Sequence, residues 1–263
     1  MAERRSEDRH RQVTRESFAR QAEDFSRSPL ITDPAFLARL VDWSEVTGAD
    51  SVLDVACGPG IVAAAFAPKV RRVVGVDVTP AMLTRAATVV REAGATNAAF
   101  VLGDVCQLPF PTAGFDRVVS RRAFHHFPDP AAVLAEMARV CTRTGAVLIE
   151  DQALPADRHA AETMTAIDRL RDPSHTRAVS PDDWPTLLGG SGLRLDRIEI
   201  VARELEVDEW LPRAHPPPEN AAQVRALLEA AARGETPGLA ARYVDGRLRF
   251  TLGLQLLRAR SAR

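Results

Sequence analysis

Short apolar runs alternate with amphipathic stretches through the middle of the chain. Five runs are apolar on both faces: SVLDVA (51–56), RRVVGVD (71–77), AAFVLGD (98–104), FDRVVS (115–120) and GAVLIED (145–151). Apolar positions at helical spacing fill segments between them, at 61–67, 80–93 and 130–140. Strands that are apolar on both faces and separated by helices are typical of a parallel sheet covered by helices on each side. We therefore expect a three-layer α/β core over residues 50–150.

Helical spacing also marks the start of the chain. Phe18 and Phe25 predict an amphipathic helix over 13–25, after a charged, frayed tail at 1–10. Asp33 before Pro34 predicts the N-cap and the first residue of a second helix. We expect these helices to form an N-terminal cap over residues 11–45.

The last hundred residues follow a different pattern. Residues 154–178 and 202–247 form inserts with apolar positions on one face, and we expect them to cover the site as a lid. Strands are predicted at 193–201 and 248–256, and in the second one apolar residues alternate strictly with polar or small ones. Strict alternation indicates a half-buried strand, which favours an antiparallel partner added to the parallel sheet. Residues 1–263 are expected to form a single domain.

Composition narrows the class of protein. The 263 residues are 46% hydrophobic and 26% charged with a formal net charge of -1, which is the balance of a folded globular protein. No apolar run approaches the roughly 18 residues of a membrane helix, and no apolar segment follows the charged N-terminus, so we expect a cytoplasmic protein. The near-neutral charge disfavours a nucleic-acid partner. Three cysteines far apart predict neither a disulfide framework nor a metal site.

The segment VLDVACGPG at 52–60 leads from the first strand into the first helix. Gly58 and Gly60 let backbone amides and the positive end of the helix dipole approach a ligand closely. Together with Ala63 this spacing also fits a dinucleotide fingerprint, so the turn alone leaves the ligand open.

Three acidic residues narrow the choice of ligand, because each lies at the carboxyl end of a successive strand. Asp54 would repel a pyrophosphate but could hold an ammonium group. Asp77 is placed to accept hydrogen bonds from ribose hydroxyls, and Asp104 from an exocyclic adenine amine. Any one of them could instead be a helix cap, but the three together favour a ligand with a ribose, an adenine and a positive charge.

As a set, these motifs resemble class I S-adenosylmethionine (SAM)-dependent methyltransferases, of the broad group similar to ubiquinone/menaquinone-type C-methyltransferases. VLDVACGPG matches the first motif, with Ala56 where many members have glycine. VVGVDVTPAML matches the second motif, GDVCQLPF the acidic loop, and FDRVVSRRAFHHFPDPAAVLAEMARV the fourth-strand region. Of the Lys-Pro-Gly-Gly turn of the fifth motif, only Gly145 is kept. The resemblance covers residues 11–150 well and the remainder loosely.

The resemblance implies a Rossmann-like, seven-stranded, mostly parallel sheet with an antiparallel last strand, and SAM as the cofactor. It also implies which residues form the cofactor site: Asp54, Ala56, Cys57, Gly58, Gly60, Asp77, Val78, Met82, Gly103, Asp104, Val105 and Arg121.

Histidines are the candidate bases. His125 and His126 follow the fourth strand at the edge where open α/β sheets bind ligands, and either can take a proton from a substrate hydroxyl or carbon acid. Local packing is the alternative role for both. His175, in the insert after the fifth strand, is a further candidate, and Asp151 is placed to orient a substrate or a base.

The acceptor is expected to be a small hydrophobic or aromatic metabolite, methylated at oxygen or carbon. The inserts carry apolar faces, which include Trp210, and we predict that Trp184, between the two inserts, contacts the acceptor. Phe18 and Phe25 are expected on the inward face of the first helix, where an aromatic ring attracts a sulfonium, although core packing explains them equally well. A homodimer and a place in secondary metabolism are further expectations.

Two other activities fit parts of the pattern. The same fold and cofactor can serve a cyclisation or dehydration without methyl transfer. A nicotinamide-dependent oxidoreductase fits the glycine turn, but Asp54 and Asp104 disfavour it. A nucleic-acid methyltransferase is disfavoured, because no basic patch and no Asn/Asp-Pro-Pro-Tyr tetrapeptide stands out in the sequence.

Overall fold

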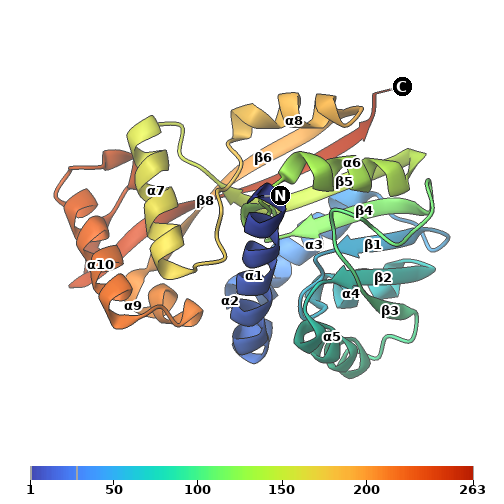
Figure 1. Cartoon of the computed structure of the whole chain (residues 1–263), viewed down its shortest axis with the longest axis horizontal. Coiled ribbons are helices and arrows are strands. Elements are labelled where there is room, and N and C mark those ends of the chain that lie inside the picture. The colour runs from blue at the N-terminus through green and yellow to red at the C-terminus, as the bar shows by residue number, and fades with distance from the viewer. Residues whose placement is uncertain (1, 28, 263) are drawn as a thin grey trace.

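The computed structural model describes residues 2–27 and 29–262, and the side chains of residues 1–8, 23–25 and 27–30 lie outside this description. Its centre is a sheet in the order β3-β2-β1-β4-β5-β8-β6, with β7 paired to β8 (Figure 1). The strands are β1 (Ser51–Val55), β2 (Arg72–Asp77), β3 (Ala98–Leu102), β4 (Phe115–Arg121), β5 (Cys141–Ala153), β6 (Leu193–Glu206), β7 (Arg242–Val244) and β8 (Arg247–Ser261).

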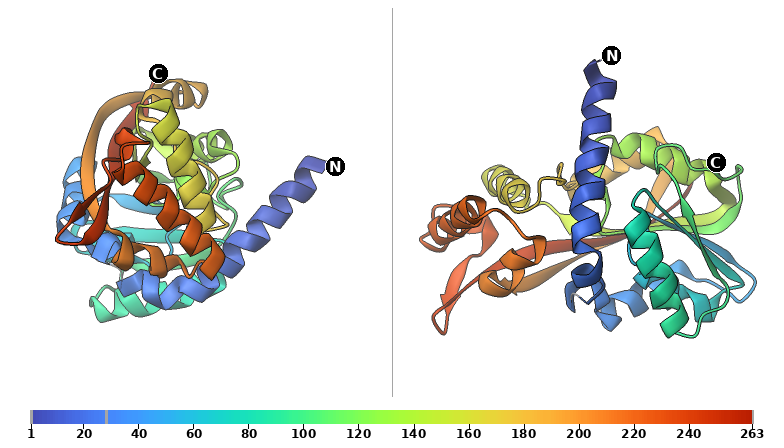
Figure 2. Two further views of the ribbon diagram at one scale, coloured as in Figure 1. Left: turned by 90° about the vertical axis from the view of Figure 1, so that its left-hand side faces the viewer. Right: turned by 60° about the horizontal axis from the view of Figure 1, so that its bottom comes forward.

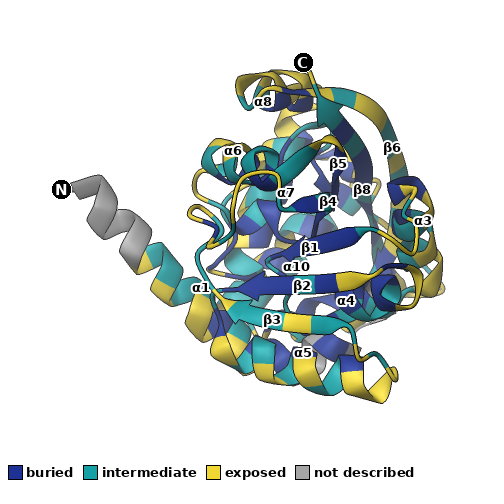
Figure 3. Cartoon of the chain, turned by 90° about the vertical axis from the view of Figure 1, so that its right-hand side faces the viewer, coloured by how far each residue is buried: buried dark blue, intermediate teal, exposed yellow. Residues whose placement is uncertain are grey.

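The directions of the strands confirm the expected mostly parallel sheet with an antiparallel last strand. Strands β1 to β5 pair in parallel, whereas β8 is antiparallel to both β5 and β6. The short strand β7 was not predicted, and it brings the sheet to eight strands. Burial is nearly continuous along β1 and β4, as parallel strands covered on both faces require (Figure 3).

Successive residues of the central strands face two separate cores. Leu53 and Val118 belong to the core under α6 (Pro130–Val140) and α8 (Trp184–Gly190). Their neighbours Val52 and Val119 belong to the opposite core. That opposite core lies under α3 (Pro34–Ser44), α4 (Ile61–Phe66) and α5 (Pro80–Glu92). Asp33 caps α3 through a hydrogen bond from the backbone NH of Ala35, as predicted.

A third core lies where β6 and β8 extend beyond β5. Helices α7 (Arg158–Arg171), α9 (Val207–Trp210) and α10 (Pro218–Ala232) pack there against the two strands, on the left in Figure 1. The inserts expected as a lid therefore build a core of their own.

Helix α1 (Ala2–Arg27) lies between the two parts of the molecule. It contacts α5 of the parallel core and the 3-10 turn Leu211–Ala214 of the third core, and the right-hand view of Figure 2 shows it between the two parts. The prediction of a frayed tail at 1–10 is wrong, because the helical backbone already begins at Ala2. A short helix, α2 (Pro29–Thr32), follows α1. In the described part of the chain no helix is long and apolar enough to cross a membrane.

Candidate active site

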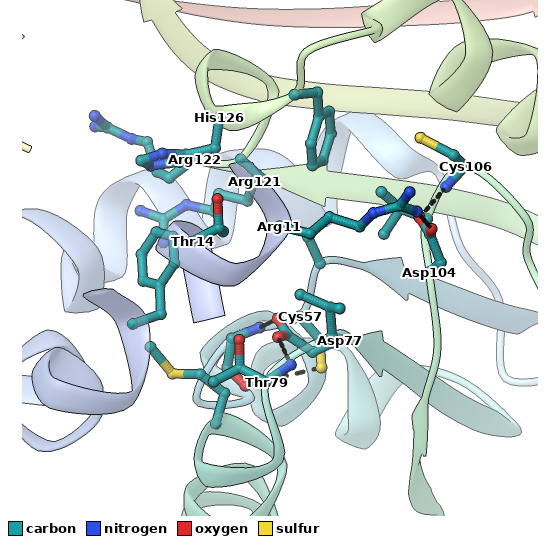
Figure 4. A pocket seen from close by; sticks show the side chains of 18 of the residues that line it. Arg11, Thr14, Cys57, Asp77, Thr79, Asp104, Cys106, Arg121, Arg122 and His126 are labelled. Carbon is teal, nitrogen blue, oxygen red and sulfur yellow. Dashed lines mark hydrogen bonds and ion pairs between the residues drawn. The ribbon is translucent and has the colours of Figure 1, made fainter. Parts of the chain in front are cut away.

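An outer cavity of about 260 Å³ opens at the carboxyl ends of β1, β2, β3 and β4, with α1 along one side (Figure 4). The predicted cofactor residues Ala56, Cys57, Gly58, Asp77, Val78, Met82, Asp104, Val105 and Arg121 all line this cavity. Asp54, Gly60 and Gly103 lie outside its lining. The structure therefore brings residues from four successive strand ends to one place.

The glycine turn has the backbone geometry that its sequence predicts. Gly58 and Gly60 have φ values of 49° and 79°, in the left-handed region that favours glycine. A Cβ atom at Gly60 would lie 2.8 Å from the Cβ of Ala86, so only glycine lets α4 begin this close to α5. Ala56 shares the left-handed conformation at φ 56°, although it carries a Cβ.

Asp77 fixes the position of this turn. One carboxylate oxygen accepts a hydrogen bond from the NH of Gly58 at 2.9 Å, and the other accepts one from the NH of Thr79 at 2.8 Å. Burial raises the pKa of Asp77, and these backbone hydrogen bonds oppose the rise. Each carboxylate oxygen retains a lone pair, so Asp77 can also accept hydrogen bonds from a ligand in the outer cavity.

Asp54 lies beneath the turn and is 1% exposed. Its Oδ2 atom has no hydrogen-bond partner among the described residues. Burial and the nearby Asp77 raise the pKa of Asp54 to about 8, against the opposing effect of Arg121. A buried carboxylate with an open oxygen fits a ligand that supplies an ammonium group.

The third acidic residue is held by the N-terminal helix. Asp104 forms an ion pair with Arg11 of α1 and accepts a hydrogen bond from the NH of Cys106 at 2.9 Å (Figure 4). Arg11 therefore ties α1 to the rim of the outer cavity.

Arg121, the last residue of β4, and Arg122, which follows the strand, share one buried carboxylate. Glu150 is 1% exposed, and its two oxygens lie 2.5 Å from Nε of Arg121 and 2.8 Å from Nε of Arg122. Arg121 also donates to the carbonyl of Ile31 at 2.7 Å. These contacts fix the wall between the outer cavity and a second one.

This second, inner cavity of about 100 Å³ lies on the other side of that wall. It is lined by Phe18, Gln21, Ile31, Arg122, His125, His126, Gln152, Asp168, Arg171, Asp172, His175, Trp210, Arg213 and Leu252. Phe18, Ile31, Arg122 and His126 line both cavities and define the junction between them.

The three predicted histidines lie together at the inner cavity. The ring centroid of His125 lies 4.2 Å from that of His126 and 4.8 Å from that of His175. His125 pairs through Nδ1 with Asp151, which also accepts hydrogen bonds from the backbone NH groups of Ala123 and Phe124. Although burial opposes it, the Asp151 carboxylate raises the pKa of His125. In the described residues, no three His, Cys, Asp or Glu groups are arranged to hold a metal ion.

His126 has different surroundings. Its Nδ1 donates to the carbonyl of Ser174 at 3.1 Å, and the Ser174 hydroxyl donates to Asp172 at 2.6 Å. Burial, and then the neighbouring charge of His125, lower the pKa of His126 to about 3, so the ring is neutral near pH 7. Phe18 lies edge-on to this ring, with 4.8 Å between the centroids.

Not every predicted acceptor residue reaches a cavity. Trp184 was predicted to contact the acceptor, but it lines neither cavity. Its side chain is fully buried against Phe124, and its indole NH donates a hydrogen bond to Gln255 at 2.8 Å. Asp151 stands behind His125 rather than in a cavity wall. The side chain of Phe25 lies outside the described residues.

The sequence analysis missed most of the polar wall of the inner cavity. Arg122, Gln152, Asp168, Arg171, Asp172 and Arg213 were not predicted as site residues. One signal was present, because Asp168, Arg171 and Asp172 stand close together in the sequence DRLRD. Burial alone distinguishes this group from an ordinary solvated helix face.

Comparison with known proteins agrees with this geometry. Residues 52–145 match the methyltransferase domain family. The chain is 31% identical over 207 residues to YcgJ, an uncharacterized methyltransferase of Bacillus subtilis, covering 79% of this chain and 82% of YcgJ.

Solved structures extend the match. The crystal structure of YcgJ superimposes with a TM-score of 0.81 at 29% identity, covering 86% of this chain and 98% of that one. BH2331 from Bacillus halodurans also gives a TM-score of 0.81, at 31% identity over 85% of this chain and 97% of that one. The cyclase SpnF shares the fold alone, with a TM-score of 0.59 at 18% identity over 86% of this chain and 80% of SpnF.

The fold and the strand-end site define a class I, Rossmann-like α/β enzyme that transfers methyl groups. The chain belongs to the methyltransferase family, and its cofactor is S-adenosylmethionine. The unpartnered oxygen of Asp54 and the position of Asp77 in the cavity wall are compatible with the ammonium and hydroxyl groups of that cofactor.

Proposed function

We propose that the outer cavity binds SAM and the inner cavity binds a small acceptor, whose oxygen or carbon receives the methyl group at the junction. The observation that carries this proposal is the position of His126. Its ring lines both cavities, and its Nδ1 is hydrogen-bonded to the carbonyl of Ser174. A methyl group that passes between the cavities has to pass beside this ring.

The proposed cofactor contacts follow from the chemistry of each side chain. Asp54 would hold the ammonium group, Asp77 the ribose hydroxyls and Asp104 the adenine amine, and Arg121 would complete the wall beside them. When bound, SAM supplies an electrophilic methyl group on a positively charged sulfur. The protein's contribution is then to align the acceptor with that group and to take up a proton.

We assign the proton-accepting role to Nε2 of His126. Because Nδ1–H donates to the Ser174 carbonyl, the neutral ring presents an acceptor nitrogen at Nε2. A pKa of about 3 makes the ring a weak base. A hydroxyl oxygen that has gained a methyl group is far more acidic than an imidazolium, so the proton still moves downhill to His126.

His125 takes a supporting role in this scheme. Its ion pair with Asp151 holds a positive charge beside His126, and that charge keeps His126 unprotonated before the reaction. His175 lies further from the outer cavity and is a candidate for contact with the acceptor.

The chemistry of the acceptor is the least constrained part of the proposal. Phe18, Ile31, Trp210 and Leu252 give the inner cavity apolar walls, which supports an aromatic metabolite. A role in secondary metabolism, a cytoplasmic location, a homodimer, a single domain over 1–263 and membership of the ubiquinone/menaquinone-type group remain proposals.

The direct test uses SAM labelled in its methyl group and a panel of phenols, hydroxylated acids and quinols. Methyl transfer predicts S-adenosylhomocysteine together with a product that carries the label. Conversion of a substrate without label uptake would contradict methyl transfer. It would favour the second candidate, a cyclisation, which the buried histidines of the inner cavity could also serve.

A further inference from the structure

Arg171 is a half-buried arginine at the end of α7 that lines the inner cavity. Its guanidinium lies over the Trp210 ring at 4.2 Å, and one Nη donates to the Trp210 carbonyl at 3.1 Å. Its Nε is buried and has no hydrogen-bond partner among the described residues. In the described part of the chain, these contacts hold the side chain, and it forms no ion pair with a carboxylate.

The carboxylates nearest to Arg171 are already engaged elsewhere. Asp168 accepts a hydrogen bond from Gln152 at 2.6 Å. Asp172 accepts hydrogen bonds from the hydroxyl of Ser174 at 2.6 Å and from its NH at 2.9 Å. Burial raises the pKa of Asp168 to about 6, against the opposing effects of the Gln152 hydrogen bond and the charges of His125 and Arg171. Burial lowers the pKa of Arg171 to about 10, and the charges of Asp168 and Asp172 oppose this shift.

A second arginine lies on the same cavity from another element. Arg213 belongs to the turn Leu211–Ala214, and its nearest carboxylate, that of the exposed Glu209, is 4.0 Å away. Two guanidinium groups from separate elements therefore line one cavity. In the described residues, Nε of Arg171 has no hydrogen-bond acceptor, and Arg213 has only the distant carboxylate of Glu209. Guanidinium groups bind carboxylates through paired, charge-assisted hydrogen bonds.

His175 adds a neutral group to this wall. It is 7% exposed, and neither ring nitrogen has a hydrogen-bond partner in the described part of the chain, although Nε2 lies 3.4 Å from Asp168. Burial, followed by the charges of His125 and His126, lowers the pKa of His175, so the ring is neutral. A neutral imidazole can donate one hydrogen bond and accept another, as an oxygenated ligand requires.

We propose that the inner cavity takes a hydroxylated carboxylate, with its carboxylate on Arg171 and Arg213 and its methyl-accepting hydroxyl at His126. This inference rests on the proposed methyl transfer and names the class of acceptor. The apolar walls formed by Phe18 and Trp210 then cover the faces of an aromatic ring between the two polar groups.

The test compares acids with uncharged molecules of the same shape. Calorimetry on the complex with S-adenosylhomocysteine measures the binding of 2-, 3- and 4-hydroxybenzoate and of the three matching hydroxybenzamides. We expect at least one acid to bind about 10- to 100-fold more tightly than its amide, the range for hydrogen bonds to a charged group. Arg171→Gln and, separately, Arg213→Gln should reduce this preference, and Arg171→Gln should reduce it more.

Arg158→Gln is the matched control, because Arg158 begins the same helix with a side chain that is 92% exposed. It should keep the full preference. Should Arg171→Gln fail to fold, Arg171→Lys together with Arg213→Gln decides the question. Binding of S-adenosylhomocysteine without any acid binding, or amides binding as tightly as acids, would overturn the carboxylate inference alone. Failure of S-adenosylhomocysteine itself to bind would overturn the proposed function.

Discussion

The outer and inner cavities share four residues but are built in different ways. The outer cavity is formed by the ends of successive parallel strands and the short loops that follow them. Backbone NH groups in these loops hold the Asp77 carboxylate in place. The inner cavity is formed by side chains from α1, the segment after β4, β5, α7, β8 and the turn Leu211–Ala214, which lie far apart in the sequence. A constant cofactor can therefore be held by backbone geometry, while the acceptor is selected by side chains on separable elements.

The two cavities also differ in how charge is buried. At the outer cavity, Asp77 lines the wall with Asp54 buried near it, and burial raises the pKa of both carboxyl groups. The inner cavity mixes arginines, histidines and carboxylates, and its pKa values shift in both directions. This difference allows each cavity to be perturbed separately.

The largest effect is expected at the junction. His126→Ala should lower turnover of an identified acceptor by about 10²- to 10⁴-fold, because the proton acceptor is lost. Affinity for S-adenosylhomocysteine should stay within about twofold, as measured by calorimetry, because binding energy for the cofactor comes from the other strand ends. The control is His159→Ala, an exposed histidine of α7. Unchanged turnover in the His126 variant would remove the base assignment.

The next effect separates the outer cavity from the inner one. Asp77→Ala should weaken S-adenosylhomocysteine binding by about 10- to 100-fold, since hydrogen bonds to a charged carboxylate are lost in the turn and to the ribose. Acceptor binding to the remaining complex should change little. Asp182→Ala, an exposed acidic residue before α8, serves as the control. Equal cofactor affinity in calorimetry of wild type and Asp77→Ala would contradict the ribose assignment.

A pH titration addresses Asp54. With a pKa of about 8, its carboxyl group is mostly protonated at pH 7, so binding of an ammonium group must release that proton. The affinity for S-adenosylhomocysteine should therefore fall as pH is lowered from 8 to 6, by up to about tenfold per pH unit. Asp54→Asn should flatten this dependence, and any titration of the ligand itself is common to both proteins. Parallel pH profiles for the two would contradict the role of Asp54.

The smallest effect concerns the backbone of the glycine turn. Ala56 has φ 56°, a conformation that costs a residue with a Cβ about 1–2 kcal/mol. Ala56→Gly removes this strain but gives the unfolded chain more freedom, at about 0.4–1 kcal/mol. We expect a net gain in unfolding free energy of at most about 1 kcal/mol by denaturant titration. Ala113→Gly, at φ 55° in a loop away from the turn, should change stability similarly; a clear loss in both variants would contradict the strain argument.

The same contrast explains what the sequence could predict. The outer cavity was largely predictable, because a tight turn needs glycine and a strand-end carboxylate is local information, as with Gly58 and Asp77. The inner cavity was not, because Arg171 and Arg213 meet only after β6 and β8 extend and the third core forms. Trp184 shows the limit of periodicity: its helical spacing predicts burial but does not say which core receives it.

The most direct measurement is a crystal structure of the complex with S-adenosylhomocysteine. The account predicts the ribose at Asp77, the ammonium group at Asp54 and the sulfur atom facing the junction formed by Phe18, Arg122 and His126. The methyl group of SAM would then point into the inner cavity. A sulfur atom that faces away from His126, with the inner cavity closed off behind the ligand, would contradict the assignment of the two cavities.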